Sequence, residues 1–401
     1  MTAAVSFSPY DYQVQDDPYP VYARLRAEAP LYRNDELDFW ALSRHADVAA
    51  AFRDHDRFSN ANGVSIDPSA WGPRAQRTMS FLAMDPPRHT RMRALVSRGF
   101  TPRRVQALEA RVSELAGKHL RPCLERGTFD FVADFAGLLP MDVVSELVGV
   151  PEQDRAALRP LADALVHRED GLAAVPRAGA EAALRLIVYF AGLVRERRAR
   201  PGGGTGAQDL TSALLAAEID GDRLTDEEII GFLFLMIVAG NETTTKLLAN
   251  ALYWGWRNPA ELARPMSDQG FIPAWVEETL RYDSTSQVLA RTVTADFAVH
   301  GQTIPAGDRM LLLIGAANRD PAVFGDPDVY DLGRDTSNSI SFGAGRHYCL
   351  GANLARLEAR VALTEFARLV RRFDVDEAGA ERVHSANVRG FARLPVAAEV
   401  R

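Results

Sequence analysis

The sequence predicts a mainly α-helical protein with a small β portion, folded as a single domain over residues 1–401. Helical periodicity dominates the chain, one long apolar segment has the length of a central helix, and strand patterns are few and short. No internal repeat or low-complexity segment divides the chain. With 47% hydrophobic residues, the chain can bury one large core.

The longest expected helix begins at Thr225, which forms a capping box with Glu228. No stop signal follows until Asn258-Pro259, and about 32 residues at roughly 1.5 Å each would span about 48 Å. Its first half is apolar on all sides, which indicates a helix in the interior.

Other helices are expected at Thr101–Arg121, after a Thr-Pro start signal, and over 161–200, as one or two helices interrupted near Gly171 and Pro176. The Gly-rich segment 201–206 is a loop. No Gly-Lys-Ser/Thr follows it, so it does not bind phosphate.

Strand patterns cover three short segments: Val293–Gln302, with a turn at His300-Gly301, then Arg309–Ile314 and the hairpin-like tail Val383–Val396.

Charge and composition exclude several classes of protein. The net charge of −7 gives no general reason to expect nucleic acid or an anionic membrane as partner. The N-terminus has no signal-peptide pattern, and the apolar run Phe232–Ala239 is shorter than the roughly 20 residues of a membrane span. Two cysteines, Cys123 and Cys349, cannot form a disulfide framework. We expect a cytoplasmic monomer in which Cys123 is an ordinary buried residue.

The other cysteine lies where a Gly-rich loop enters a helix whose apolar face carries Leu354 and Leu357. Free N–H groups and the helix dipole at this position favour a thiolate at Cys349. A thiolate is a soft ligand suited to iron. Zinc would require three further Cys or His ligands at regular spacing, and these are absent from the sequence.

The loop Phe342-Gly343-Ala344-Gly345-Arg346-His347-Tyr348-Cys349-Leu350-Gly351 resembles the heme-binding signature of the cytochromes P-450 at every fixed position. The resemblance implies heme b, with Cys349 as the iron ligand. It also implies that Phe342 shields the sulfur, that His347 reaches a propionate, and that Gly343 and Gly351 allow close approach. The alternative is a Gly-rich loop before an ordinary helix.

The long helix contains a break in its apolar pattern at Ala239-Gly240-Asn241-Glu242-Thr243. Glycine and a carboxylate are both costly inside a buried helix, and such breaks mark functional sites. Carboxylate and hydroxyl together can relay protons. The segment is similar to the acid–alcohol pair of the same family, which implies catalytic roles for Glu242 and Thr243. By the same resemblance Ala239 and Gly240 lie against the heme, with Gly240 leaving room for dioxygen. The alternative is a Thr bonded to its own helix and an exposed Glu.

Three more segments of the sequence resemble family elements that surround the heme. His89 and Arg93 share one helix face, and with Arg291 they are expected to bind the propionates, since Arg offers a bidentate fork. The alternative for Arg291 alone is a cation at a strand edge. Glu278 and Arg281, three residues apart, resemble a family ion pair with a structural role.

The resemblance implies a monooxygenase that inserts one atom of O2 into a hydrophobic small molecule. Electrons would come from NAD(P)H through a ferredoxin-type redox partner and its reductase. Arg91, Arg98, Arg103 and Arg104 could form a basic patch for that donor, or simply a solvated face.

The substrate is expected to contact Asn60–Leu82, 161–186, Val288-Leu289 and Val388–Phe391. Two other functions stay open at this stage: a heme-thiolate peroxygenase that takes peroxide directly, and a heme sensor without turnover. The retained Glu242-Thr243 pair argues against both.

Overall fold

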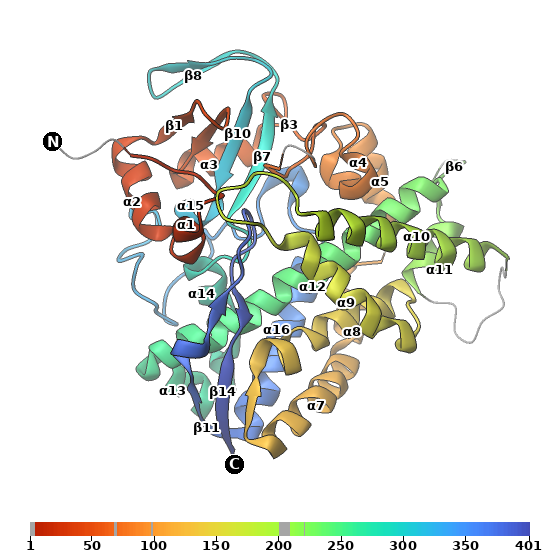
Figure 1. Ribbon diagram of the computed structural model, residues 1–401, viewed down its shortest axis with the longest axis vertical. Coiled ribbons are helices and arrows are strands. Elements are labelled where there is room, and N and C mark those ends of the chain that lie inside the picture. The colour runs from red at the N-terminus through yellow and green to blue at the C-terminus, as the bar shows by residue number, and fades with distance from the viewer. Residues whose placement is uncertain (1–4, 68–69, 98, 200–208, 220) are drawn as a thin grey trace.

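The computed structural model describes residues 5–401 except 68–69, 98, 200–208 and 220. The largest sheet lies at one end of the molecule, near the N-terminus, and helices make up most of the rest (Figure 1). The C-terminus lies at the opposite end of the molecule from that sheet. The expected loop at 201–206 falls outside the described residues.

The helices of the first half of the chain are α1 (Tyr12–Asp16), α2 (Tyr19–Glu28), α3 (His45–Arg53), α4 (Gln76–Met79), η2 (Ser80–Ala83), α5 (Arg88–Ser97), α6 (Pro102–Ala107), α7 (Glu109–Arg126), η3 (Val132–Ala136), α8 (Leu138–Val148), α9 (Glu152–Val166) and α10 (Arg177–Ala199). Those of the second half are α11 (Leu210–Ala216), α12 (Asp226–Arg257), α13 (Pro259–Ser267), η4 (Gln269–Phe271), α14 (Ile272–Tyr282), α15 (Ile314–Ala317), η5 (Gly345–His347), α16 (Ala352–Leu369) and η6 (Glu377–Gly379).

The strands are β1 (Leu31–Asn34), β2 (Phe39–Leu42), β3 (Phe58–Ser59), β4 (Thr128–Asp130), β5 (Glu218–Ile219), β6 (Asp222–Arg223), β7 (Val288–Val293), β8 (Phe297–Val299), β9 (Gln302–Ile304), β10 (Arg309–Leu313), β11 (Val370–Val375), β12 (Glu381–Arg382), β13 (Phe391–Arg393) and β14 (Pro395–Val400). The largest sheet has the order β1-β2-β10-β7-β3, and a second has the order β11-β14-β4. In the first sheet β10 pairs parallel with β2 and antiparallel with β7.

Helix α12 is the central element, as the sequence predicts. Thr225 and Glu228 cap it reciprocally, and it ends at Arg257, before Asn258 and the proline that starts α13. It is the one helix in the described part of the chain that is long and apolar enough to cross a bilayer, but 72% of its most apolar window is buried by protein. The helix is therefore the core of the fold.

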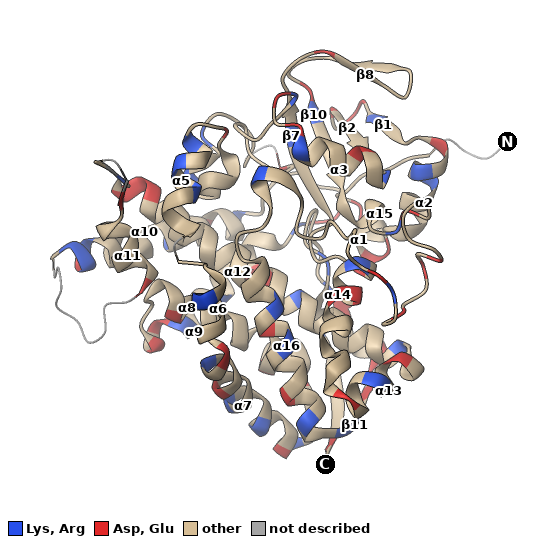
Figure 2. Cartoon of the chain, turned by 180° about the vertical axis from the view of Figure 1, so that it is seen from behind, with Lys and Arg blue, Asp and Glu red and all other residues tan. Residues whose placement is uncertain are grey.

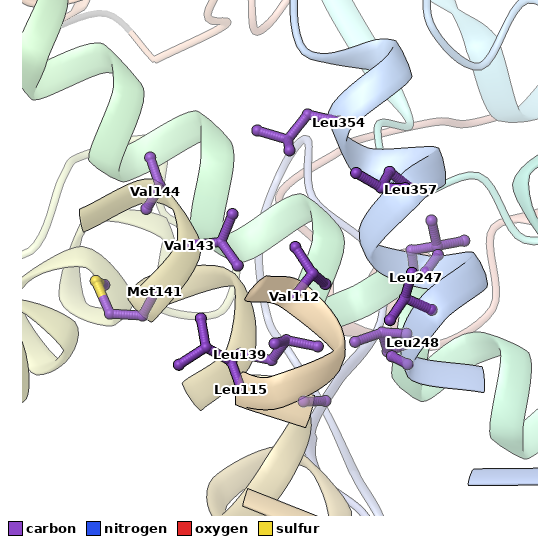
Figure 3. Close-up of a cluster of buried hydrophobic side chains, with 14 of the residues drawn as sticks. Val112, Leu115, Leu139, Met141, Val143, Val144, Leu247, Leu248, Leu354 and Leu357 are labelled. Atoms are coloured by element: carbon purple, nitrogen blue, oxygen red, sulfur yellow. The ribbon is translucent and has the colours of Figure 1, made fainter. Parts of the chain in front are cut away.

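The core forms where α7, α8 and α16 pack around α12 (Figure 3). The side chains that interlock there are aliphatic and nearly all fully buried: Val112, Leu115, Leu139, Met141, Val143, Val144, Leu247, Leu248, Leu354 and Leu357. A second apolar cluster lies between α3 and the large sheet. Both clusters hold segments that the sequence analysis assigns to the site.

Several expected element bounds change in the structure. The single helix expected at 101–121 is two helices, α6 and α7, which meet at Leu108. The interruption expected between 161 and 200 separates α9 from α10. The expected strand at 293–302 is the hairpin β8–β9, while β7 starts earlier, at Val288. In the tail, β12 pairs with β13, whereas β14 joins the sheet of β11.

Candidate functional site

The cysteine loop lies between η5 and the start of α16. The Cys349 N–H donates to the Phe342 carbonyl at 3.0 Å, which closes the loop on itself. The Arg356 guanidinium lies 4.5 Å from the centre of the Phe342 ring and also bonds Glu277. The loop is thus held in place by α14 and α16, and the thiol sits next to a helix N-terminus, as expected.

Two positions of this loop require glycine for a reason that the sequence did not indicate. Gly343 and Gly345 have φ of 69° and 68°, in the left-handed region that favours glycine. A Cβ on Gly345 would lie 2.7 Å from the Phe52 carbonyl oxygen. These two glycines therefore let the loop pack on α3. Gly351, by contrast, has only the Cys349 sulfur near its Cβ position, at 4.0 Å.

The helix end favours a thiolate at Cys349, as the sequence predicts, but a second influence opposes it. Cys349 is exposed, yet desolvation by the surrounding protein raises the pKa of Cys349. The Gly351 backbone N–H and the charges of Arg93 and Arg356 lower the pKa but do not outweigh burial. A coordinated metal ion deprotonates a thiol outright, so the site favours a thiolate only with a cation on the sulfur.

Four cationic or N–H-bearing side chains converge beside the thiol. The His89 and His347 rings lie 4.1 Å apart, and Arg93 Nη2 donates to the Tyr348 carbonyl at 2.6 Å. Arg291, from β7, is close enough to His347 to depress its pKa. The predicted set of His89, Arg93, Arg291 and His347 is therefore brought together.

These four side chains have few hydrogen-bond acceptors around them. Within the described residues, both ring nitrogens of His89, Nδ1 of His347 and Nη1 of Arg93 are buried without a hydrogen-bond partner. Burial, with Arg93 nearby, lowers the pKa of His89 to about 4, and burial lowers the pKa of Arg291 to about 10.

The charge of Asp85 acts on His89 and Arg291, but this carboxylate already accepts hydrogen bonds from Ser59 and from the Asn60 backbone. The cluster therefore lacks negative charge, which is the condition that a ligand with carboxylates would relieve.

Helix α12 presents an accessible stripe in the middle of its buried length. Met236, Gly240 and Thr243 are partly accessible and Ala239 is exposed, while residues on both sides of them along the helix are buried. Their spacing places these four residues on one helix face. Phe81 connects this helix to the cationic cluster, with its ring 6.1 Å from those of Phe232 and His89.

Glu242 lies on a different face of α12 and is 2% exposed, so the alternative of an exposed Glu is wrong. Its Oε2 lies 3.1 Å from Lys246 Nζ, one turn further along. The Asp163 carboxyl of α9 is a hydrogen-bond partner of the Glu242 carboxyl. Sequence reasoning missed both neighbours. The Glu242–Lys246 spacing could have indicated the first, but nothing local points to Asp163.

Thr243 is bonded within its own helix, as the alternative proposed. Its Oγ1 donates to the Ala239 carbonyl at 2.7 Å. Gly240 allows close helix packing, because a Cβ there would lie 3.2 Å from Val144 Cγ2 of α8. The structure shows α12 as regular α-helix at this point. Space for dioxygen at Gly240 stays a prediction.

The pair Glu278–Arg281 is a core ion pair. Arg281 Nε and Nη2 bond the two carboxylate oxygens of Glu278 at 2.8 and 2.7 Å, and both side chains are at most 1% exposed. Arg281 also donates to the carbonyls of Asn318 and Pro327. The pair fastens α14 to the segment after α15, which confirms its structural role.

The expected basic patch is smaller than the sequence suggested. Arg91 bonds Glu228 at 2.9 Å, so it braces the start of α12 and is not available to the patch. Arg98 lies outside the described residues. Arg103 and Arg104 are exposed on α6.

Some segments expected to contact substrate lie close together in the fold. Helix α4 and η2, within 60–82, pack against α12, and so do α9 and α10. Ser286 forms a β-bridge with Val388, which brings the start of β7 to the tail. Contact of these residues with a substrate stays a prediction.

The site residues fit heme. Buried nitrogen donors without acceptors suit two propionates, and a lone thiol suits an axial iron ligand. The described residues contain no group of three or more His, Cys, Asp or Glu side chains that could hold a metal ion without a cofactor.

Comparison with known proteins gives the same assignment. The family model described as Cytochrome P450 matches residues 266–400. Cytochrome P450 123 of Mycobacterium tuberculosis is 59% identical over 98% of this chain and 97% of its own length. The monooxygenase PikC of Streptomyces venezuelae is 38% identical over 95% and 91%.

Solved structures agree over nearly the whole chain. CYP109Q5 of Chondromyces apiculatus matches with a TM-score of 0.88 at 33% identity, covering 99% of each chain. CYP109E1 of Bacillus megaterium in complex with testosterone also has a TM-score of 0.88, at 30% identity over 96% of this chain and 98% of that one. The chain therefore belongs to the cytochrome P450 family of heme-dependent monooxygenases, which act on small molecules.

Proposed function

We propose that Cys349 would hold the heme iron through its thiolate and that His89, Arg93, Arg291 and His347 would bind the heme propionates. The single observation that carries this proposal is the set of buried donors without acceptors beside a lone thiol. Bound heme supplies oxygen activation, which an axial thiolate favours by donating electron density. The propionate charges would also reverse the pKa depression of the two histidines.

The residues around the cofactor follow from the same proposal. Phe342, Gly343 and Gly351 border the heme on the thiolate side. Ala239 and Gly240, on the accessible stripe of α12, border it on the other side. The exposure of Ala239 in the middle of a largely buried helix supports this placement.

Glu242 and Thr243 then have separate tasks in handling protons. Glu242 holds the proton supply inside the protein, because it is buried beside Lys246 and Asp163. The Thr243 hydroxyl faces the accessible stripe and keeps acceptor capacity while it donates to Ala239. A relay through these two groups delivers protons to the reacting side of α12 and excludes bulk water from it.

The substrate is a hydrophobic small molecule, which undergoes hydroxylation or a related oxidation. The accessible stripe contributes Met236 and Ala239, whose side chains are apolar. CYP109E1, at 30% identity, was solved with testosterone and with a second steroid, corticosterone, at 31%. Testosterone is therefore the first compound for a binding screen.

Electrons reach the site from NAD(P)H through a ferredoxin-type protein and its reductase. A surface hollow of about 490 Å³ lies between α6, α14 and α16, and Arg356 and Arg360 line it. Arg356 also touches the Phe342 ring of the cysteine loop. Basic segments of α6 and α16 lie on this side of the molecule (Figure 2). An acidic donor that docks here would be close to the thiolate.

Product formation tests the reaction. The purified protein is screened for spectral shifts with hydrophobic compounds, starting with testosterone, and each binder is then incubated with dioxygen, NADPH, ferredoxin and reductase. We expect an oxygenated product only when all components are present. Equal rates with peroxide alone would indicate a peroxygenase. Binding and reduction without product from any binder would indicate a sensor.

Charge neutralisation tests the electron donor. The double variant Arg103→Gln, Arg104→Gln should slow ferredoxin-driven reduction at low salt, and the difference should shrink as salt screens the charges. The matched control Arg371→Gln, Arg372→Gln removes two exposed charges from β11. Reduction kinetics equal to those of the unmodified protein at low salt would refute docking at this face.

A further inference from the structure

A second carboxyl group lies between Glu242 and solvent. Asp163 is in the last turns of α9, with its side chain 50% exposed, whereas Glu242 is 2% exposed. The two carboxyl groups are hydrogen-bond partners. Two carboxylates cannot donate to each other, so this hydrogen bond requires a proton on one of them.

The surrounding charges place that proton on Asp163. Lys246 Nζ lies 3.1 Å from Glu242 Oε2, while the Arg159 guanidinium is 4.0 Å from the Asp163 carboxylate. Burial opposes ionisation of Glu242, but the Lys246 charge and the Asp163 hydrogen bond together lower its pKa. Partial burial, the hydrogen bond with Glu242 and the Glu242 charge raise the pKa of Asp163 to about 8, with Arg159 and Lys246 acting in the opposite direction.

The site is also incompletely satisfied. Among the residues that the structure describes, Glu242 Oε2 and Asn241 Oδ1 are buried without a hydrogen bond of good geometry. Buried structural networks normally satisfy every member, and unsatisfied groups accompany function. A proton that can move between the two carboxyl groups accounts for this arrangement.

We propose that Asp163 is the solvent-side member of a two-carboxyl relay and supplies protons to Glu242. The proposal rests on the proposed role of Glu242 and extends it. The Asp163 O–H bond breaks as an O–H bond forms on Glu242, and the exposed Asp163 carboxylate then takes a proton from bulk water. Glu242 passes its proton toward Thr243 and returns to the carboxylate. One proton crosses per cycle, and no electron moves in these steps.

Infrared titration of the ferric holoenzyme tests the shared proton without any turnover. We expect the C=O stretching band of a protonated carboxyl at neutral pH, which is lost with a midpoint near pH 8. Asp163→Asn should remove the band. Glu242→Gln should shift the midpoint to lower pH, because the charge that raises the Asp163 pKa is gone. Glu152→Gln, an exposed carboxyl of α9 that pairs with Lys118, is the control and should change nothing.

A kinetic measurement tests the delivery of protons from Asp163 to Glu242. NADPH consumption by the protein with ferredoxin and reductase should slow severalfold in Asp163→Asn, less than the roughly 10²-fold expected for Glu242→Gln. The solvent deuterium isotope effect should rise, and Asp163→Glu should restore the rate.

The outcomes separate the two levels of the proposal. If Asp163→Asn leaves the infrared band unchanged, or leaves the rate of NADPH consumption and its isotope effect unchanged, the role of Asp163 is overturned. The proposed role of Glu242 is not affected by that result. Normal consumption and coupling in Glu242→Gln overturns the relay at Glu242 itself. A second measurement, the ferrous carbon monoxide spectrum of each variant, shows that the variants fold and hold heme.

Discussion

Two buried acid–base pairs of this protein have nearly the same spacing along a helix and opposite surroundings. Glu278–Arg281 on α14 is fully enclosed. Arg281 donates hydrogen bonds to both carboxylate oxygens of Glu278 and to backbone carbonyls. Glu242–Lys246 on α12 leaves one carboxylate oxygen without a well-formed hydrogen bond and adjoins the half-exposed Asp163. The first pair is a structural ion pair, whereas the second can exchange a proton with solvent.

The difference shows that burial of a charge pair does not by itself tell its role. A buried pair with every group satisfied is strongly destabilised when one partner is removed. A pair with an unsatisfied oxygen and a protonated neighbour can instead adjust its charge by moving a proton. Stability should therefore depend mainly on the first pair, and turnover on the second.

The largest effect is expected for Arg281→Ala. This change removes both charged hydrogen bonds that Arg281 makes to Glu278, leaves Arg334 as the remaining cation at 3.3 Å, and removes the donors to two backbone carbonyls. We expect a loss of about 3–5 kcal/mol in the free energy of unfolding, measured by chemical denaturation of the holoenzyme. The control is Arg177→Ala, which removes an exposed pair with Glu181. A midpoint for Arg281→Ala equal to that of the control would contradict the structural role.

Thr243→Ala should leave folding nearly unchanged and waste reducing equivalents as peroxide or water. The hydroxyl is the last protein group of the proposed relay, and positioned proton donors contribute roughly 10²–10⁴-fold to rate. Product formed per NADPH consumed is the measurement. The control Thr245→Ala removes a buried hydroxyl bonded to Ala136 and Asn241, so stability should fall while coupling is kept. Full coupling in Thr243→Ala would show that this hydroxyl is dispensable.

NADPH consumption should also fall as pH rises through about 8. The relay uses the protonated form of Asp163, which predominates below its pKa and disappears above it. The fall in the rate of NADPH consumption near this pH should be absent in Asp163→Asn. A wild-type rate that is flat across this range, with ferredoxin and reductase shown to be unaffected, would contradict the relay.

The smallest effect on stability is expected for Lys246→Met. Without the Lys246 charge, only the Asp163 hydrogen bond and the Arg159 charge oppose burial, so the pKa of Glu242 rises. A carboxyl group that takes up a proton avoids a buried charge. The free energy of unfolding should fall by less than for Arg281→Ala. An equal or larger loss would show that Glu242–Lys246 is also a structural pair.

Local sequence patterns predicted the parts of the site that are contiguous in the chain. The cysteine loop, the capping box at Thr225 and the shared face of His89 and Arg93 all depend on residues within a few positions of one another. Contacts between distant helices were missed for the same reason. Arg91 pairs with Glu228 at the start of α12, and Asp163 reaches Glu242 from α9. Neither contact has a local signature.

The sequence also could not give the protonation state of a group, because this depends on total burial. The helix N-terminus at Cys349 correctly indicated a lowering influence, yet desolvation by the surrounding protein raises the thiol pKa overall. The same applies to Glu278 and Arg281, whose spacing is as common on surfaces as in cores. Only packing decides between the two.

The ferrous carbon monoxide difference spectrum of the wild-type protein and of Cys349→Ser tests the central claim most directly. We expect the strongly red-shifted absorption band of a thiolate-ligated heme in the wild type and its complete loss in the variant, with Cys123→Ser spectrally unchanged. A red-shifted band that survives in Cys349→Ser would contradict the assignment of Cys349 as the iron ligand.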